Sequence, residues 1–372
     1  MKNSTTKPIN LNKTTKQNMI TYAIVAACFV FCIIYSGLPG ASSLIKGLFV
    51  PICAYVIMAL SLNLTVGILG ELSLGHAGFM CLGAFVGSTF SLLTEDALTS
   101  VWVRFPIAIL LGGLVAAVAG VLIGIPVLRL RGDYLAIVTL AFGEIIKNIV
   151  NNIYLIKDVN GMHFSLGVEG YNKMQLDAAS TTNVINGAMG ITGAPRDSNY
   201  IVGFILVLVT LAVILNLVHS RTGRAIMAIR DNRIAAESIG VNITKYKLIA
   251  FSISAMFAGM AGVLYGHNLS SLVAAKFDYN LSILVLVFVV LGGIGSMRGS
   301  IIAAIILTAL PELLRGSFSD YRMLIYAVLL IVMMLVNNNE TMKMYKERFK
   351  SYLRPTKDRK NSRPDNGQEV SA

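Results

Sequence analysis

Apolar runs of about twenty residues recur along the chain, and short polar stretches separate them. A helix of that length crosses the roughly 30 Å hydrocarbon core of a bilayer. The expected fold class is therefore all-α, a polytopic transmembrane helical bundle. The pattern predicts about ten spans, at Met19–Tyr35, Leu44–Leu69, Gly75–Leu93, Phe105–Leu128, a run that starts at Tyr134, Tyr200–Val218, Lys247–His267, Leu281–Leu291, Ser300–Leu314 and Arg322–Val336.

Polar segments divide the chain into parts. Residues 1–18 carry basic charges and no acid, and residues 337–372 are polar and charged, so both ends are predicted to be disordered tails. Between them, residues 19–336 form the transmembrane domain. Within it lie a long Asn-, Gly- and Thr-rich segment at 151–199 and a polar, basic loop at 220–245.

Composition and charge agree with a membrane protein and give it an orientation. The chain is 55% hydrophobic and only 13% charged, whereas soluble domains have about 25% charged residues. Its net charge of +12 resides in tails and short loops, so it indicates topology and not nucleic acid. The positive-inside rule places the loops at 70–73, 129–133, 220–245 and 292–299 in the cytoplasm and 151–199 outside. The prediction is a multi-pass protein of the cytoplasmic (inner) cell membrane with both termini cytoplasmic.

The most polar internal block is SRTGRAIMAIRDNRIAAESIGVN, at Ser220–Asn242. Its apolar residues recur at helical spacing, and Gly240 follows where a helix can end with positive φ. This pattern predicts two short amphipathic helices outside the bilayer. An ordinary positive-inside connector fits the composition equally well, but a connector needs neither this length nor this apolar pattern.

Glycine clusters and a few polar side chains interrupt the spans. Glycines allow close helix packing, and paired clusters are also typical of broken helices that line a cavity. Glu144 has Lys147 three residues on, so a local ion pair and a place on a translocation path are both open. His76 is either a packed, hydrogen-bonded histidine or a ligand. The four cysteines lie in apolar runs and are expected to be free thiols, and no spacing resembles a metal site.

Missing motifs narrow the function. The chain has no GxxxxGK[ST] loop, no HExxH and no GxSxG, so nucleotide hydrolysis by the P-loop route and the corresponding membrane hydrolases are disfavoured. The expectation is a transport subunit that is not an enzyme, binds no cofactor itself and is driven by a separate partner.

Several motifs in order resemble one family. GELSLGHAGFMCLGAF at Gly70–Phe85, RLRGDYLAIVTLAFGEI at Arg129–Ile145, the Ser220–Asn242 block, NGAMGITG at Asn186–Gly193 and VVLGGIGSMRGSIIAA at Val289–Ala304 are similar to permeases of branched-chain amino acid ABC importers of the LivM type. The resemblance covers most of the chain apart from the tails. The chain departs from the pattern by its long basic C-terminal tail and an extended segment between Tyr154 and Ala188.

The resemblance implies partners and a mechanism. The partners are a second related permease, two cytoplasmic ABC ATPases that bind ATP-Mg, and an extracellular or periplasmic solute-binding protein. Glycine-broken spans would alternate access around a path near the bilayer midplane. The candidate coupling residues, in an EAA-like loop that docks on an ATPase, are Arg224, Arg230, Arg233, Ala235, Ala236, Glu237 and Gly240. The candidate path residues are Ser73, Gly75, His76, Gly78, Thr139, Glu144, Gly292 and Gly293.

Two other functions stay open. Related permeases carry urea or another small amide, and nothing in the sequence identifies the solute. An ion-coupled secondary carrier that uses Glu144 is a more remote alternative, because it leaves the basic loop at 220–245 without a purpose. Arg221 could contact anionic lipid headgroups, while Arg230 and Arg233, nearer the coupling segment, are expected to meet acidic ATPase residues.

Overall fold

The computed structural model describes residues 11–37, 43–130, 132–158, 161–172, 182–313, 327–328 and 331. The chain forms two compact units, Met1–Arg315 and Gly316–Ala372, and every element named below belongs to the first. Its transmembrane helices are α1 (Leu11–Gly37), α2 (Ser43–Asn63), α3 (His76–Leu93), α4 (Val101–Val127), α5 (Asp133–Asn151), α7 (Tyr200–His219), α10 (Ile243–Gly266), α11 (Tyr279–Gly292) and α12 (Met297–Leu313).

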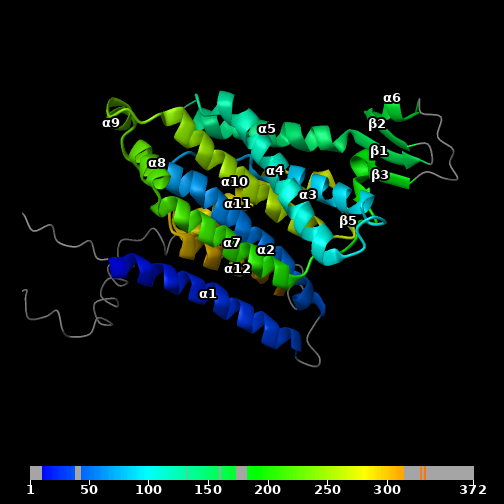
Figure 1. The fold of residues 1–372 in the computed structure, drawn as a ribbon, viewed down its shortest axis with the longest axis horizontal. Helices are drawn as coiled ribbons and strands as arrows, with labels where there is room; N and C mark the ends of the chain where they lie inside the picture. The colour runs from blue at the N-terminus through cyan, green and yellow to red at the C-terminus, as the bar shows by residue number, and fades with distance from the viewer. Residues whose placement is uncertain are drawn as a thin grey trace, which may run out of the picture. The chain divides into compact units, whose positions relative to one another are not determined.

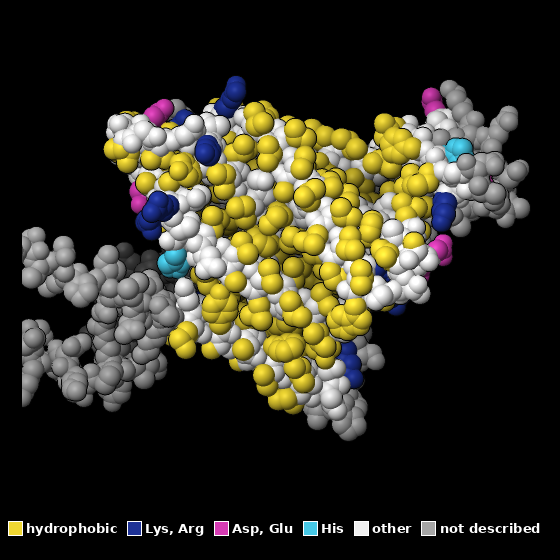
Figure 2. Space-filling model, viewed as in Figure 1, with side chains coloured by type: hydrophobic (Ala, Val, Ile, Leu, Met, Phe, Trp, Pro, Cys, Tyr) yellow, Lys and Arg dark blue, Asp and Glu magenta, His cyan; other side chains and the backbone are white. Residues whose placement is uncertain are grey.

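The helical membrane fold predicted from the sequence is confirmed. In the described part of the chain, eight helices are long and apolar enough to cross a bilayer, and α12 contributes a shorter apolar stretch at Met297–Pro311. These helices correspond to the first nine predicted spans. The tenth predicted span, 322–336, lies almost entirely outside the described residues. Figure 2 shows hydrophobic side chains over the middle of the visible face and basic side chains toward its ends, as a bilayer requires.

Helix α10 lies at the centre of the bundle and packs on α2, α3 and α4 (Figure 1). Glycines make the contact between backbones possible. A Cβ atom at Gly83 would lie 2.1 Å from the carbonyl oxygen of Gly259, and one at Gly262 would lie 2.0 Å from that of Met80. Small residues at helix interfaces are how membrane helices gain van der Waals contact without a hydrophobic driving force. For these glycines, close packing is therefore the function.

Two helices begin inside the bundle. An extended segment, residues 70–75, follows α2 and leads back among the helices to the start of α3, where His76 meets Ser254 in the middle of α10. Helix α11 starts at the same depth, since Ala77 N–H donates to Ser282 Oγ at 3.1 Å. The two helices run in opposite directions from this level. Helix α3 starts after Gly75, as a glycine break predicts, whereas α11 starts after Asp278 and its glycines lie at its other end.

A π-helix, η1 (Leu64–Leu69), ends α2 and is fully buried. The Asn63 side chain holds its start, because Oδ1 accepts from Gly295 N–H at 2.8 Å and Nδ2 donates to Ser300 Oγ at 3.0 Å. These bonds tie η1 to the turn between α11 and α12. Gly70 follows η1 with φ +80°, which reverses the chain into the extended segment.

The segment at 151–199 is more ordered than its composition suggests. It contains β1 (Ile153–Asp158), β2 (Gly161–Leu166), the short helix α6 (Val168–Asn172) and β3 (Thr182–Asn186), and the strands form an antiparallel sheet in the order β2-β1-β3. The 3₁₀ turn η2 (Gly187–Met189) and β4 (Ile191–Thr192) follow, and β4 pairs with β5 (Ser271–Leu272). A second 3₁₀ turn, η3 (Ala274–Lys276), leads to α11.

A buried ion pair fixes this sheet region to the membrane helices. Arg104, near the start of α4, forms a bidentate pair with Asp197 at 2.6–2.9 Å, and both side chains are about 95% buried. The composition of residues 151–199 indicated a connection of weak apolar content, and strands were not predicted there. The signal was the alternation at Met162, Phe164 and Leu166, which is a strand pattern of period two.

We predict that Gly262→Ala destabilises the protein by about 1–3 kcal/mol, because the new methyl group must displace the Met80 backbone. Gly47→Ala is the matched control. Gly47 also lies in a helix, but nothing lies within 4 Å of its Cβ position, so alanine's better helix propensity leaves stability equal or up to about 1 kcal/mol higher. Thermal unfolding of both variants in detergent measures this. Equal behaviour of the two would contradict close packing at Gly262.

Candidate functional site

Two short helices, α8 (Arg221–Asp231) and α9 (Arg233–Ser238), form the polar block between α7 and α10. Each start is capped by a side chain, which satisfies a free N–H of the first turn. Ser220 Oγ accepts from Gly223 N–H at 3.1 Å and Asn232 Oδ1 from Ala235 N–H at 3.0 Å. Asn242 caps α10 in the same way. The predicted pair of amphipathic helices is therefore present, and capping side chains determine where each helix begins.

Gly240 ends α9 in the left-handed conformation, with φ +84°. Its N–H donates to the Glu237 carbonyl at 3.0 Å, and the N–H of Val241 donates to the Ala236 carbonyl at 3.1 Å. This is the Schellman arrangement, which reverses the chain and satisfies the last carbonyls of the helix. Nothing lies within 4 Å of a Cβ atom at Gly240, so its need for glycine is conformational and not steric.

The block has one buried face and one exposed face. Ile229, Ala236 and Ile243 pack together beneath it and hold α8, α9 and the start of α10 as one piece. On the opposite side Ile234 is 81% exposed and Ile239 is 76% exposed, with Ala235 and Glu237 exposed beside them. Two large aliphatic side chains therefore lie exposed on an otherwise polar surface.

The arginines of the block have different roles. Arg224 is exposed, and Arg233 is half-buried. Arg230 reaches inward, where Nη1 donates to the Gly67 carbonyl of η1 at 2.9 Å and its aliphatic stem packs on Gly70. Its guanidinium also bonds Asp231. Arg230 thus joins α8 to the end of α2, which the sequence alone did not indicate.

A second link joins this end of the bundle. Lys247 of α10 and Glu71 of the extended segment form an ion pair, with side chains 5% and 15% exposed. Buried charges are tolerated only when paired, so this contact fixes the position of the extended segment against α10. Neither residue was a sequence candidate. Their separation by 176 positions leaves no local signal.

Most of the candidate path residues are brought together. His76 is 1% exposed, and its Nε2 lies 2.8 Å from Ser254 Oγ, which donates to the Ser61 carbonyl at 2.5 Å. Ser73 Oγ lies 3.4 Å from His76 Nδ1. His76 is therefore a packed, hydrogen-bonded histidine, which is the first of the two alternatives that the sequence left open. His76 holds the start of α3 against α2 and α10.

Thr139 and the early glycines complete this packing. Thr139 Oγ1 accepts from Leu74 N–H at 3.0 Å, and a Cβ atom at Gly75 would lie 2.3 Å from the Thr139 carbonyl. Gly78 packs equally closely on Gly143 of α5. These contacts hold the start of α3 against α5 and α10.

Glu144 lies beside this packed group, at the edge of a narrow cleft. The local ion pair with Lys147 is present, and Glu144 Oε1 also accepts from Tyr279 N–H, the first residue of α11, at 3.0 Å. The cleft is shallow and tightly packed, and it has no enclosed space for a water molecule. It is lined by Leu74, Ala77, Gly78, Leu140, Gly143, Glu144, Phe277, Asp278, Tyr279 and Ser282.

Gly292 and Gly293 lie apart from this cleft. Gly292 packs on Gly299 where α11 turns into α12, and Gly293 has φ +93° in that turn. The turn contacts η1 through Asn63, as described above. These two glycines therefore belong to the turn between α11 and α12 and not to the His76 group.

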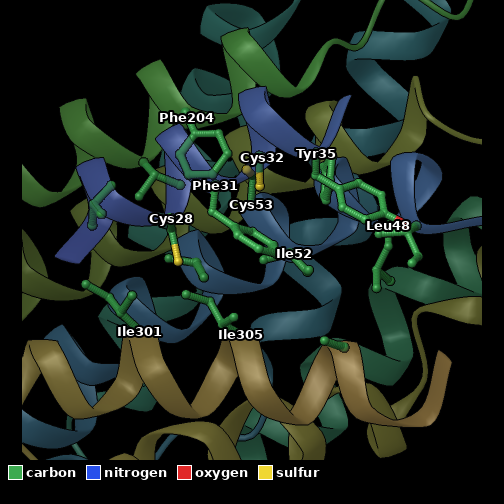
Figure 3. A pocket seen from close by; sticks show the side chains of 16 residues that line it. Cys28, Phe31, Cys32, Tyr35, Leu48, Ile52, Cys53, Phe204, Ile301 and Ile305 are labelled. Atoms are coloured by element: carbon green, nitrogen blue, oxygen red, sulfur yellow. The ribbon is translucent and has the colours of Figure 1, made fainter. Parts of the chain in front are cut away.

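A separate apolar cavity of about 220 Å³ lies between α1, α2, α7 and α12 (Figure 3). Cys28, Cys32 and Cys53 line it, and all four cysteines are free thiols, as predicted. Among the described residues that line this cavity, none is charged. Among the described residues, no group of three His, Cys, Asp or Glu side chains could hold a metal ion.

Comparison with known proteins gives a consistent result. The family model described as "Branched-chain amino acid transport system / permease component" matches residues 44–335. The high-affinity branched-chain amino acid transport system permease proteins LivM of Salmonella typhimurium and of Escherichia coli are each 40% identical over 290 residues, 76% of this chain. The alignment covers 66% of each LivM, so the chain spans just under two thirds of these relatives.

A more distant relative is the permease protein LivH of the same kind of system in Salmonella typhimurium. It is 22% identical over 297 residues, which is 76% of this chain and 89% of LivH. No solved structure matches the chain.

We predict that Arg230→Met lowers stability by about 1–3 kcal/mol, because the Gly67 carbonyl loses its donor. Arg221→Met removes an equal charge from the exposed surface of the same helix and changes stability by about 0.5 kcal/mol or less. Unfolding of the two purified variants in detergent measures the difference. A loss in Arg221→Met as large as in Arg230→Met would show that charge, and not the bond to η1, is what matters.

Proposed function

Since the chain belongs to the family of permease components of branched-chain amino acid transport systems, we propose that it is the membrane-spanning subunit of an ABC importer. It moves branched-chain or other hydrophobic amino acids across the cytoplasmic membrane by alternating access. The main observation behind this proposal is the 40% identity to LivM over 290 residues. The chain acts with a second, related permease, two cytoplasmic ATPases that hold ATP-Mg, and an external solute-binding protein.

The ATPase docks on the exposed face of α9. Ile234 and Ile239 supply apolar anchors, and Glu237 supplies a charge between them. Interfaces gain most of their affinity from a few anchors that become fully buried on binding. Ile229, Ala236 and Ile243 pack α8, α9 and the start of α10 together. A movement of the exposed face of α9 is therefore expected to move α8 and α10 with it.

Two contacts transmit a movement of α8, α9 and α10 to the extended segment before α3. Arg230 joins α8 to η1, and Lys247 joins α10 to Glu71. The first contact lies just before the extended segment that leads to the start of α3, and the second lies within that segment. A shift of α9 on nucleotide binding would therefore displace the same segment that holds His76 and the edge of the cleft beside Glu144. Packed elements with two arrangements transmit such shifts over long distances.

The coupling role predicts that Glu237→Lys leaves membrane insertion intact and abolishes retention of the ATPase. The substitution reverses a charge on the exposed face of α9, where the Glu237 side chain has no hydrogen bond or ion pair with the described residues. The chain is co-expressed with its candidate ATPases and purified in detergent, and the ATPase that remains bound is measured together with leucine uptake. Gly240→Trp is expected to act alike, because tryptophan does not adopt φ +84° readily and α9 would lose its end.

Gly240→Asn is the matched control, since asparagine tolerates the left-handed conformation better than other non-glycine residues. It should retain most ATPase binding and uptake. Normal uptake by Glu237→Lys would remove the coupling role from α9. Uptake of urea but not of leucine by the wild-type assembly would instead assign the chain to a small-amide importer.

A further inference from the structure

The Glu144–Lys147 ion pair is an unusual feature for a membrane-crossing helix. Gly143, next to Glu144, packs on Gly78, which places the pair at the level where α3 and α11 begin. The two side chains are not fully enclosed, because Lys147 is 19% exposed and Glu144 is 27% exposed. Charges at bilayer depth are costly, so they face protein or water and commonly mark a substrate pathway.

Three groups of fixed position converge there. Glu144 Oε2 bonds Lys147, and Glu144 Oε1 accepts from Tyr279 N–H. The second bond fixes the carboxylate from another helix, so the site is more than an ion pair within one helix. Beside the pair lie Leu74 and Leu140, which are apolar and partly exposed. A negative group, a positive group and an apolar surface are thus adjacent on one edge of this chain.

We propose that Glu144 and Lys147 recognise the ammonium and carboxylate groups of an α-amino acid during transport, with the apolar side chain directed along the surface of Leu74 and Leu140. This inference rests on the proposed transport function and identifies residues that bind the charged groups of the solute. The substrate ammonium takes the place of Lys147 beside Glu144, and the substrate carboxylate takes the place of Glu144 beside Lys147. Every charge keeps an opposite partner throughout, so no unpaired charge is created at membrane depth.

The same exchange explains selection against neutral solutes. A neutral amide such as urea could separate the ion pair only by leaving two charges with weaker, uncharged partners. Specificity is a difference between two binding free energies, and an unpaired charge in a poorly solvated site raises the energy of the wrong complex. The pair therefore admits a zwitterion and opposes a neutral amide of similar size.

The test is the double substitution Glu144→Gln/Lys147→Gln in the complete transporter, reconstituted in proteoliposomes with its binding protein. Removing both charges avoids the unpaired charge that a single substitution would leave. Uptake of labelled L-leucine and ATP hydrolysis stimulated by the loaded binding protein are measured together. We expect uptake to fall about tenfold or more, equivalent to at least about 1.4 kcal/mol, while stimulated hydrolysis stays within about twofold of wild type.

The control is Asn148→Ala, which removes an exposed polar side chain one position further along α5 and should leave leucine uptake unchanged. Leucine uptake at the wild-type rate in the double variant would overturn the assignment of Glu144 and Lys147 while the proposed function stands. A proportional fall in uptake and hydrolysis would reduce the pair to a structural contact. Wild-type transport of urea without leucine would overturn both proposals.

Discussion

The structure depends on satisfying the backbone where helices break inside the membrane. Lipid offers no hydrogen bonds, so irregular backbone survives at that depth only where protein supplies partners. At each break a side chain from another helix does so. Leu74 N–H reaches Thr139, Ala77 N–H reaches Ser282, and Gly295 N–H reaches Asn63. Tyr279 N–H reaches Glu144 in the same way. The few polar residues in an apolar bundle are placed where the backbone needs them.

The same constraint connects α8 and α9 to the membrane interior. The extended segment at 70–75 cannot move alone, because its two ends and its middle are bonded to different helices. Arg230 contacts the π-helix before it, Lys247 pairs with Glu71 within it, and Thr139 accepts from Leu74 near its end. A displacement of α8 and α9 must therefore move or break these contacts together. Such a cooperative unit suits a protein that changes between two arrangements.

The glycines have two distinct uses in this molecule. Gly83, Gly259 and Gly262 bring helix backbones into contact around α10, and any larger residue would separate the helices. Gly70, Gly240 and Gly293 instead have positive φ and reverse the chain at the ends of η1, α9 and α11. The first group sets the packing of the bundle, and the second sets where its breaks and its coupling helices end. The sequence predicted the helix end at Gly240 and close packing at the glycine clusters, but not which backbones meet at Gly83, Gly259 and Gly262.

The sequence by itself determined the features that depend on local composition. Long apolar runs specified the spanning helices, and the capping residues Ser220, Asn232 and Asn242, with Gly240, specified the limits of α8, α9 and α10. The i, i+3 spacing of Glu144 and Lys147 specified their ion pair. The ordered motifs, such as GELSLGHAGF, indicated the family. These signals lie within one helix, one turn or one motif, so they need no knowledge of distant contacts.

Only the tertiary structure decided which distant residues meet. The contacts of Arg230 with Gly67, Lys247 with Glu71 and Asn63 with Ser300 join positions more than 160 residues apart. The tertiary structure also places Gly292 and Gly293 away from the His76 group. It pairs β1, β2 and β3 as a sheet, and such pairing depends on partner strands and not on local sequence alone. Packing of helices, and not local propensity, selects these pairs, since in the membrane close fit and mutual hydrogen bonding supply the free energy of association.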